Sequence, residues 1–504
     1  MKVFFVHLDL GIGGAEMLVV NAAVAAKKAG HEVVIYTSHH DPARCFEDTT
    51  GNGALSGLIR VRGDWLPRHL WGRFTALCAV WRMMWVSLCV VRDVRRGRNA
   101  REAQPEGCVV FCDGVSAPVP LLRLAAPVLF YCHFPDKLLC VKRGFLLKRL
   151  YRWPLDLLEE VTTGCASSVA VNSNFTAGIF REAFPHLGKR FVCETQEISG
   201  GGGQKEGRCL AEDDGKDGKP MEALVGSGDE MLGGNDGGGR GKRRLSVLYP
   251  PTNVKAYARR GCDDLPPPGR VAGPVVSLNR FDRTKNLPLA VKALAWAVSD
   301  IGGEEAARIG LRLVVAGGYD ERVQENVEHL EELRELAKSL EMEGFIEFRR
   351  NVGDEERSAL LRGASCVLYT PSREHFGIVP VEAMCSGAPV IAVNSGGPLE
   401  TVVHNRTGLL CLPTAEAFGS AIVKVARDPT LAESMGKEGR RRVQEKFSME
   451  SFAGAFDSCL REVCVSGTDC AAMRWLGPGF TVVLAFLAGL VASGWWYRAK
   501  HMAD

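Results

Sequence analysis

Two glutamates, Glu374 and Glu382, are separated by seven residues in the segment "REHFGIVPVEAMCSG", which also contains Pro380. The apolar run "SCVLYTPS" before it predicts a buried strand, so this segment is expected to be a strand-end loop that leads into a helix. Pro380 suits the first position of that helix, because a proline there gives up no intrahelical hydrogen bond. Glu374 then lies before the helix, and Glu382 lies in its first turn.

The backbone amides at this helix start are candidates for holding an anion. They belong to Phe376, Gly377, Ile378 and Val379, and the positive end of the helix dipole lies behind them. The pattern predicts a phosphate site between the two glutamates, with one carboxylate on a sugar hydroxyl and the other on a ribose. The alternative is an ordinary helix start with two solvated acids.

Two cations follow another predicted strand. The run "VVSL" is followed by "NRFDRTKN", which contains Arg280 and Lys285. Fixed cations at a strand end can neutralise a diphosphate, both in a bound donor and as a leaving group. Solvated charges at a helix start are the alternative. The chain contains no Asp-x-Asp triplet, so the usual carboxylate clamp for a metal-bound nucleotide diphosphate is missing and no catalytic metal is expected.

The first half of the chain contributes a glycine-rich turn. Gly13 and Gly14 in "DLGIGGAE" lie between a predicted strand and a predicted helix, where their amides can face an anion. Glu16 stands where a dinucleotide fingerprint has its third glycine, and the second strand lacks the acid that would hold a ribose. Both departures argue against a dinucleotide oxidoreductase. A turn needed only for packing is the alternative.

The segment "YCHFPD" places His133 and Asp136 at the end of another predicted strand. A histidine in that position is either a catalytic group or a structural one. The residues alone leave both interpretations open.

These motifs lie on an α/β pattern, in which short β-rich runs alternate with helical stretches. Such alternation predicts parallel sheets covered by helices on both faces. We expect two facing, Rossmann-like, doubly wound domains, since ligands of open α/β sheets bind outside the carboxyl ends of the strands. The predicted parts are an N-terminal acceptor-side domain over residues 1–255, a linker over 256–272, and a C-terminal donor-side domain with a terminal crossover helix over 273–465.

Three segments stand apart in composition. Residues 194–244 are rich in glycine and charge and poor in aromatic residues, which predicts a disordered insert in the first domain. Residues 476–496 carry no charge and are long enough to cross a bilayer, which predicts a transmembrane or membrane-embedded segment; a buried helix is the alternative. The Trp-rich stretch 71–91 predicts either a helix in the membrane interface or a core helix.

The bulk composition excludes some classes of protein. The formal net charge is +3 over 504 residues, which gives no reason to expect nucleic-acid binding. The 17 cysteines include no Cys-x-x-Cys pair, so we expect reduced thiols and a cytosolic environment.

Taken together, the motifs "GIGGAE", "NRFDRTKN", "EHFGIVPVE" and "NSGGP" resemble those of glycosyltransferase family 4. These are retaining enzymes of the two-domain GT-B fold. Within that family, the longer segments "HLDLGIGGAE", "YCHFPD", "LYPPTNV", "EHFGIVPVEAM" and "VIAVNSGGPLE" look most like those of the mannosyltransferases of asparagine-linked glycosylation that form α-1,3 and α-1,6 linkages. The resemblance covers about residues 1–191 and 246–456.

This resemblance implies GDP-mannose as the donor substrate and no cofactor. It implies a dolichol-diphosphate-linked chitobiose bearing one mannose as the acceptor, and catalytic domains on the cytosolic face of the endoplasmic reticulum membrane. Neighbouring mannosyltransferases would be further partners. Another retaining GT-B enzyme acting on a different lipid-linked acceptor is the alternative, and a catalytically inactive scaffold is a further one.

The resemblance also implies roles for individual residues. Glu382 would hold the ribose, and Glu374 with the amides after it would hold the mannose. Arg280 and Lys285 would hold the diphosphate. Gly13 and Gly14 would close over the phosphates from the other domain, and His133 would approach the mannose.

Overall fold

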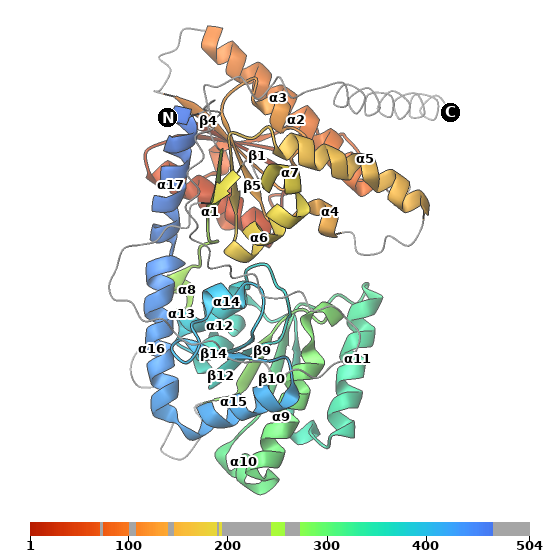
Figure 1. Cartoon of the computed structure of the whole chain (residues 1–504), viewed down its shortest axis with the longest axis vertical. Coiled ribbons are helices and arrows are strands. Elements are labelled where there is room, and N and C mark those ends of the chain that lie inside the picture. The colour runs from red at the N-terminus through yellow and green to blue at the C-terminus, as the bar shows by residue number, and fades with distance from the viewer. Residues whose placement is uncertain are drawn as a thin grey trace, which may run out of the picture.

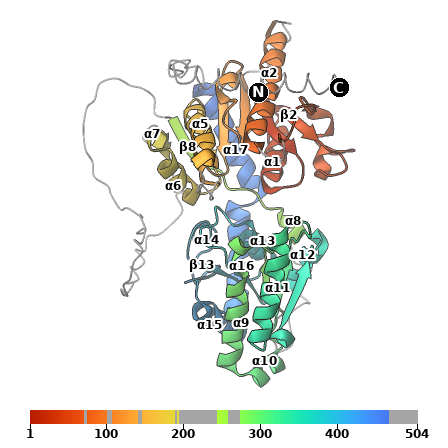
Figure 2. The same cartoon turned by 90° about the vertical axis from the view of Figure 1, so that its right-hand side faces the viewer.

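The computed structural model describes residues 1–70, 74–99, 107–139, 146–188, 191–193, 243–257 and 273–466. Two parallel β-sheets form the centres of two α/β domains, one above the other in Figure 1 and again in the view turned by 90° in Figure 2. This confirms the predicted pair of parallel-sheet α/β domains. The predicted insert, most of the linker and the segment 476–496 lie outside the described residues.

The first sheet has eight strands in the order β3-β2-β1-β4-β5-β6-β8-β7, all parallel. The strands are β1 (Lys2–Leu10), β2 (Glu32–His40), β3 (Ile59–Val61), β4 (Cys108–Asp113), β5 (Val128–Cys132), β6 (Ser168–Val171), β7 (Phe191–Cys193) and β8 (Arg243–Val247). β7 and β8 are parallel, hydrogen-bonded neighbours in this sheet.

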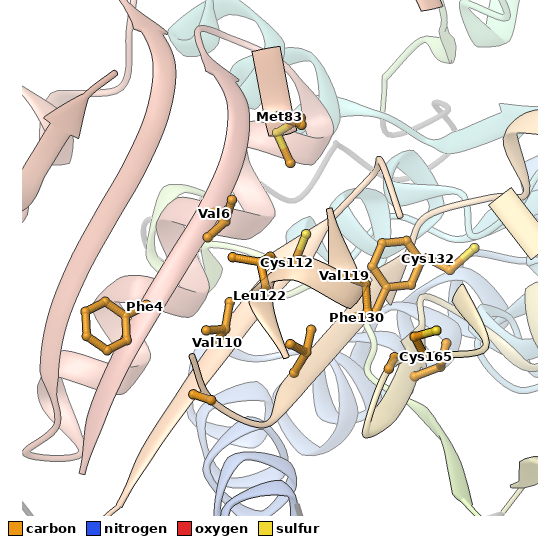
Figure 3. Packing of buried hydrophobic residues seen from close by; sticks show 14 of the residues in the cluster. Phe4, Val6, Met83, Val110, Cys112, Val119, Leu122, Phe130, Cys132 and Cys165 are labelled. Atoms are coloured by element: carbon orange, nitrogen blue, oxygen red, sulfur yellow. The ribbon is translucent and has the colours of Figure 1, made fainter. Parts of the chain in front are cut away.

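Helices cover both faces of this sheet. They are α1 (Gly14–Lys28), α2 (Thr75–Asn99), α3 (Val119–Leu122), α4 (Asp136–Leu139), α5 (Leu146–Thr163), α6 (Asn174–Ala183) and α7 (Pro185–Gly188). The short helix α8 (Val254–Tyr257) follows β8 but packs on the second domain, against α12 and α13. Alternate residues of a strand point to opposite faces. Phe4 and Val6 accordingly pack with Met83 of α2 (Figure 3), whereas Val3 and Phe5 pack against α1 on the other face.

The second sheet has six parallel strands in the order β11-β10-β9-β12-β13-β14. They are β9 (Val275–Leu278), β10 (Leu313–Gly317), β11 (Ile346–Arg350), β12 (Cys366–Tyr369), β13 (Val390–Val393) and β14 (Gly408–Cys411). The helices are α9 (Leu287–Ile301), α10 (Gly303–Ile309), α11 (Gln324–Ser339), α12 (Asp354–Gly363), α13 (Ile378–Ser386), α14 (Pro398–Thr401), α15 (Ala415–Arg427), α16 (Pro429–Lys446) and α17 (Met449–Ser466).

The last helices connect the two domains. In Figure 1, α16 runs along the second domain and α17 continues onto the first. Phe452 and Phe456 of α17 are buried in the same cluster as Phe5 and Phe111 of the first sheet. The ring centroids of Phe111 and Phe456 lie 5.4 Å apart. The end of the described chain therefore completes the core of the first domain.

Most of the Trp-rich stretch 71–91, for which the sequence predicts an interfacial or a core helix, belongs to α2. Its segment Thr75–Arg96 is the one helical segment within the described ranges that is long and apolar enough to cross a bilayer, and 56% of its most apolar window is buried inside the protein. Met83, Val86 and Val90 pack in the core, whereas Trp85 and Leu88 are exposed. The core-helix interpretation explains the buried face, and membrane contact of the exposed face stays a prediction.

Candidate functional site

The second sheet brings the two predicted donor motifs together. Its strand order reverses between β9 and β12, and open α/β sheets bind ligands at such a switch point. Arg280 and Lys285 follow β9, and Glu374 follows β12. Segments about 90 residues apart in the chain thus meet at one edge of the sheet, because β9 and β12 are hydrogen-bonded neighbours.

Lys285 and Glu374 form an ion pair at this edge. Lys285 Nζ lies 2.6 Å from Glu374 Oε2, and the two side chains are 18% and 22% exposed. The Thr370 hydroxyl donates a hydrogen bond to the carbonyl oxygen of Lys285 at 2.7 Å. Asn286, at a left-handed φ of 49°, then turns the chain into α9. The ion pair therefore holds the Lys285 side chain in place, and a part of that side chain reaches solvent.

Arg280 is positioned differently. Its side chain is 73% exposed, and its guanidinium lies 3.3 Å from Asp282. Lys285 is thus more buried than Arg280 and has the shorter ion pair, and the binding of a diphosphate by both cations stays a prediction. The difference arises because Lys285 is held through its carbonyl oxygen by Thr370 and through its ammonium by Glu374, whereas the side chain of Arg280 pairs with Asp282.

The helix after Glu374 begins earlier than predicted. Gly377 is the N-cap of α13 with φ 78°, and the helix starts at Ile378. A Cβ on Gly377 would lie 3.1 Å from the Tyr369 ring, so glycine is needed for both its φ and its close contact. Pro380 is accordingly the third helical residue rather than the first. It still gives up nothing, because the first four N–H groups of a helix have no intrahelical partner.

Phe376, Gly377, Ile378 and Val379 surround this helix start as predicted, and a neighbouring loop supports them. The Gly397 amide donates to the Glu374 carbonyl oxygen at 2.7 Å. A Cβ on Gly397 would come within 2.3 Å of the Phe376 carbonyl oxygen. The "NSGGP" loop after β13 thus lies directly against the loop between β12 and α13, which we call the donor loop, at a distance that only glycine allows.

Glu382 is in the second turn of α13 rather than the first, and it is only 7% exposed. Tyr257 donates to its Oε1 at 3.0 Å, and Arg357 of α12 pairs with its Oε2. Burial raises the pKa of Glu382, against the opposing effects of Arg357 and Tyr257. Both carboxylate oxygens already have protein partners, so a ribose hydroxyl would add to this arrangement. Neither Tyr257 nor Arg357 was predicted from the motifs.

In the first domain, His133 lies just beyond β5 and is 27% exposed. Its Nε2 is 2.9 Å from Oδ2 of the buried Asp113 at the end of β4. Asp136, the other candidate in "YCHFPD", pairs with Arg152 of α5 at 2.8 Å. The two candidates therefore have different partners: His133 contacts the buried carboxylate of Asp113, and Asp136 forms an ion pair with Arg152 of α5.

Gly13 and Gly14 lie at the start of α1, after β1. Gly13 is its N-cap, and a Cβ there would lie 2.2 Å from the Glu16 carboxylate. A carboxylate of the protein itself thus occupies part of the space at this helix N-terminus. Closure of these glycines over a donor phosphate stays a prediction.

The carboxyl ends of the two sheets meet through specific contacts. Phe134, next to His133, stacks on His375, next to Glu374, with ring centroids 3.8 Å apart. The Ser173 hydroxyl donates to the His375 carbonyl oxygen at 2.5 Å. The loops that carry the candidate residues of the two domains therefore lie against each other.

Glu400 of α14 makes a second link. Its carboxylate accepts hydrogen bonds from the backbone amides of Asn174 and Phe175 at 2.8 and 2.6 Å, at the N-terminus of α6 in the first domain. A carboxylate is stabilised at a helix N-terminus by the unpaired backbone amides and by the positive end of the helix dipole. Tyr249 also donates to Glu400, at 3.2 Å.

No cluster of three or more His, Cys, Asp or Glu side chains suited to a metal ion occurs in the described ranges. The absence of a catalytic metal nevertheless stays a prediction.

Comparisons with known proteins agree with this geometry. Residues 274–442 match the family described as "Glycosyl transferases group 1". The alpha-1,3/1,6-mannosyltransferase ALG2 of Homo sapiens is 42% identical over 459 residues, which are 90% of this chain and 93% of the relative. ALG2 of Dictyostelium discoideum is 37% identical over 480 residues, covering 92% and 98%.

Solved structures share the fold. Sucrose-phosphate synthase from Thermosynechococcus elongatus superposes with a TM-score of 0.59 at 19% identity, covering 92% of this chain and all of that chain. HepE of Anabaena, solved in complex with UDP, gives 0.56 at 15% identity with the same coverage. Given its sequence identity to relatives over nearly their full length, the chain belongs to the ALG2 family of alpha-1,3/1,6-mannosyltransferases.

Proposed function

We propose that this chain transfers mannose from GDP-mannose, with retention, to a dolichol-diphosphate-linked chitobiose that already bears one mannose. It adds an α-1,3-linked and an α-1,6-linked mannose. The names of the relatives support the two linkages. The observation that carries the proposal is the Lys285–Glu374 pair at the switch point of the second sheet, directly beside the His133 loop.

The donor occupies the carboxyl edge of the second sheet in this proposal. Lys285, Arg280 and the amides at the start of α13 neutralise the diphosphate. Glu374 accepts a hydrogen bond from a mannose hydroxyl, and Glu382 holds the ribose while remaining paired with Arg357. His133 reaches the mannose from the first domain, which suits its place next to the Phe134–His375 stack.

The chemistry is a substitution on one face of the sugar. The bond between mannose C1 and the phosphate oxygen breaks, and a bond between C1 and an acceptor hydroxyl oxygen forms on the same face. The hydroxyl proton passes to an oxygen of the departing diphosphate. The residues contribute mainly by stabilising negative charge on that leaving group, because fixed charges and dipoles aimed at developing charge commonly lower the barrier more than any other single effect.

A lipid-linked acceptor requires the protein to work at a membrane. We propose attachment through residues 476–496, with both α/β domains on the cytosolic face of the endoplasmic reticulum. Alkaline carbonate extraction of membranes tests this attachment. The full chain should remain in the pellet, and a chain ending at residue 466 should be partly released; equal retention would contradict a role for the segment.

The decisive assay uses the full chain in detergent with labelled GDP-mannose and the defined lipid acceptor. Linkage-specific α-mannosidases should then identify one α-1,3 and one α-1,6 mannose in the product. UDP-glucose, and an acceptor without its first mannose, serve as controls. Transfer from the control donor alone would support the alternative of a related GT-B enzyme, and no transfer by folded protein would refute the proposal.

Metal independence is a separate claim. Transfer should persist in excess EDTA, because the phosphate charge is offset by Lys285, Arg280 and backbone amides. A loss of activity that added Mg²⁺ or Mn²⁺ restores would show that these groups do not suffice.

A further inference from the structure

Three side chains at the carboxyl edge of the first sheet form a chain of hydrogen bonds. His7 lies in β1, Asp113 ends β4, and His133 lies just past β5; these three strands are adjacent. His7 Nδ1 is 2.7 Å from Asp113 Oδ1, and His133 Nε2 is 2.9 Å from Asp113 Oδ2. One buried carboxylate therefore holds two imidazoles, of which only His133 has substantial exposure.

The positions of the protons follow from the state of the carboxyl group. Burial alone would raise the pKa of Asp113, but the two histidines lower it to about 2. An ionised carboxylate can only accept hydrogen bonds. Both imidazoles must therefore donate, His7 through Nδ1–H and His133 through Nε2–H. When the His133 ring is neutral, its Nδ1 carries a lone pair.

His7 also supplies a charge. Burial alone would lower the pKa of His7, but the Asp113 charge and hydrogen bond raise it above its ordinary value, with smaller contributions from Glu16 and Asp9. Asp9 itself is paired with Arg82 of α2. A protonated His7 balances the Asp113 carboxylate, so His133 is not needed to do so.

We propose that His7 and Asp113 are positioning residues that keep His133 neutral, with its proton on Nε2 and its Nδ1 lone pair available to a hydroxyl of the transferred mannose. This inference rests on the proposed function for the identity of the sugar. In this proposal Asp113 sets the tautomer and orientation of His133. His7 balances the charge of Asp113, so that the carboxylate does not favour a second proton on His133.

The first test is the pH dependence of kcat/KM. In His7→Gln the Asp113 carboxylate loses its balancing charge, so the acid limb of the profile should move to higher pH. A merely structural role would lower the rate equally at all pH values. His31→Gln is the matched control, since His31 pairs with Asp457 of α17 at 2.6 Å but lies just before β2, at the amino ends of the strands and away from the carboxyl edge that carries His133.

The second test does not depend on activity. In NMR spectra of the full chain labelled with ¹⁵N-histidine, the signals that disappear in His133→Gln belong to His133. At neutral pH these signals should show a protonated Nε2 and an unprotonated Nδ1. Asp113→Asn keeps the shape of the side chain but can also donate, so that signal should change toward a mixture of tautomers. The His31→Gln variant should leave it unchanged.

The outcomes separate the two proposals. An unmoved acid limb in His7→Gln, or an Nδ1-protonated neutral His133 in the wild type, would overturn the positioning role. Absence of mannose transfer with the expected ¹⁵N signals intact would instead refute the proposed function. If His7→Gln fails to fold, as judged by thermal unfolding, the Asp113→Asn spectrum decides, and an unchanged tautomer there contradicts the inference.

Discussion

Replacing Lys285 with alanine removes a proposed donor-site cation that Glu374 holds in place. The Lys285 side chain is 18% exposed, which suits an effective dielectric constant of about 20 rather than that of water. A unit charge about 4 Å from a phosphate oxygen then contributes about 4 kcal/mol. Because part of this interaction already exists in the bound donor, we expect kcat/KM to fall about 10³-fold and kcat about 10²-fold.

The assay compares initial rates of mannose transfer over a range of GDP-mannose concentrations. Lys437→Ala is the control, since Lys437 forms an exposed ion pair with Glu433 at 2.7 Å on α16. Thermal unfolding of each variant confirms that the fold survives. A rate for Lys285→Ala within tenfold of the wild type would refute the assignment.

A second explanation of the same loss can be separated. If Lys285 only neutralised Glu374, the double variant Lys285→Ala/Glu374→Gln would recover activity, because no unpaired carboxylate would remain beside the phosphates. If Lys285 acts on the diphosphate, the double variant stays at least as slow as the single one. Recovery to near the wild-type rate would contradict the role of Lys285 in stabilising the leaving group.

Three further changes have defined outcomes. Glu382→Gln should lower kcat/KM for GDP-mannose about 100-fold, since the amide both weakens the contact to Arg357 and replaces the ribose acceptor; an unchanged KM and kcat would exclude Glu382 from the donor site. Glu400→Ala removes the acceptor for the Asn174 amide and should lower Tm by a few degrees and broaden or split the calorimetric transition; an unchanged single transition would show that this link does not couple the domains. Burial raises the pKa of Glu159 from 4.5 to about 7, so the folded protein binds this proton more tightly than the unfolded chain. The resulting stability is present below pH 4.5 and is lost as pH rises through 7; Glu159→Gln should therefore flatten the decline of Tm between about pH 5 and 8, and an equal decline in both proteins would contradict this origin.

The donor loop was predictable because strand ends can be recognised locally. The apolar run before Arg373 indicates a buried strand, and the turn after it must then lie at the carboxyl edge of a sheet. The exact helix start was not predictable from Pro380, since it depends on the close contact between Gly377 and Tyr369. That contact belongs to the tertiary fold and leaves no local pattern.

The partners of the predicted acids were missed for a similar reason. Tyr257 precedes Glu382 by 125 positions, and Arg357 is one of several charged residues on α12. Asp113 lies at the end of an apolar strand, and nothing in the sequence around it indicates that two histidines contact it. Only the adjacency of β1, β4 and β5 brings His7 and His133 to it. Spacing along the chain predicted which loops carry chemistry, and strand order determined what those loops contact.

The packing of α17 on the first domain also affects the timing of folding during synthesis. Phe452 and Phe456 fill the face of the first sheet on which Phe5 and Phe111 lie, yet they are made roughly 200 residues after the last strand of that sheet. At about 5–20 residues per second, a translating ribosome needs on the order of 10–40 s to deliver them. For that period the nascent first domain presents an open aromatic surface, so the domain that begins to form first is the last to close.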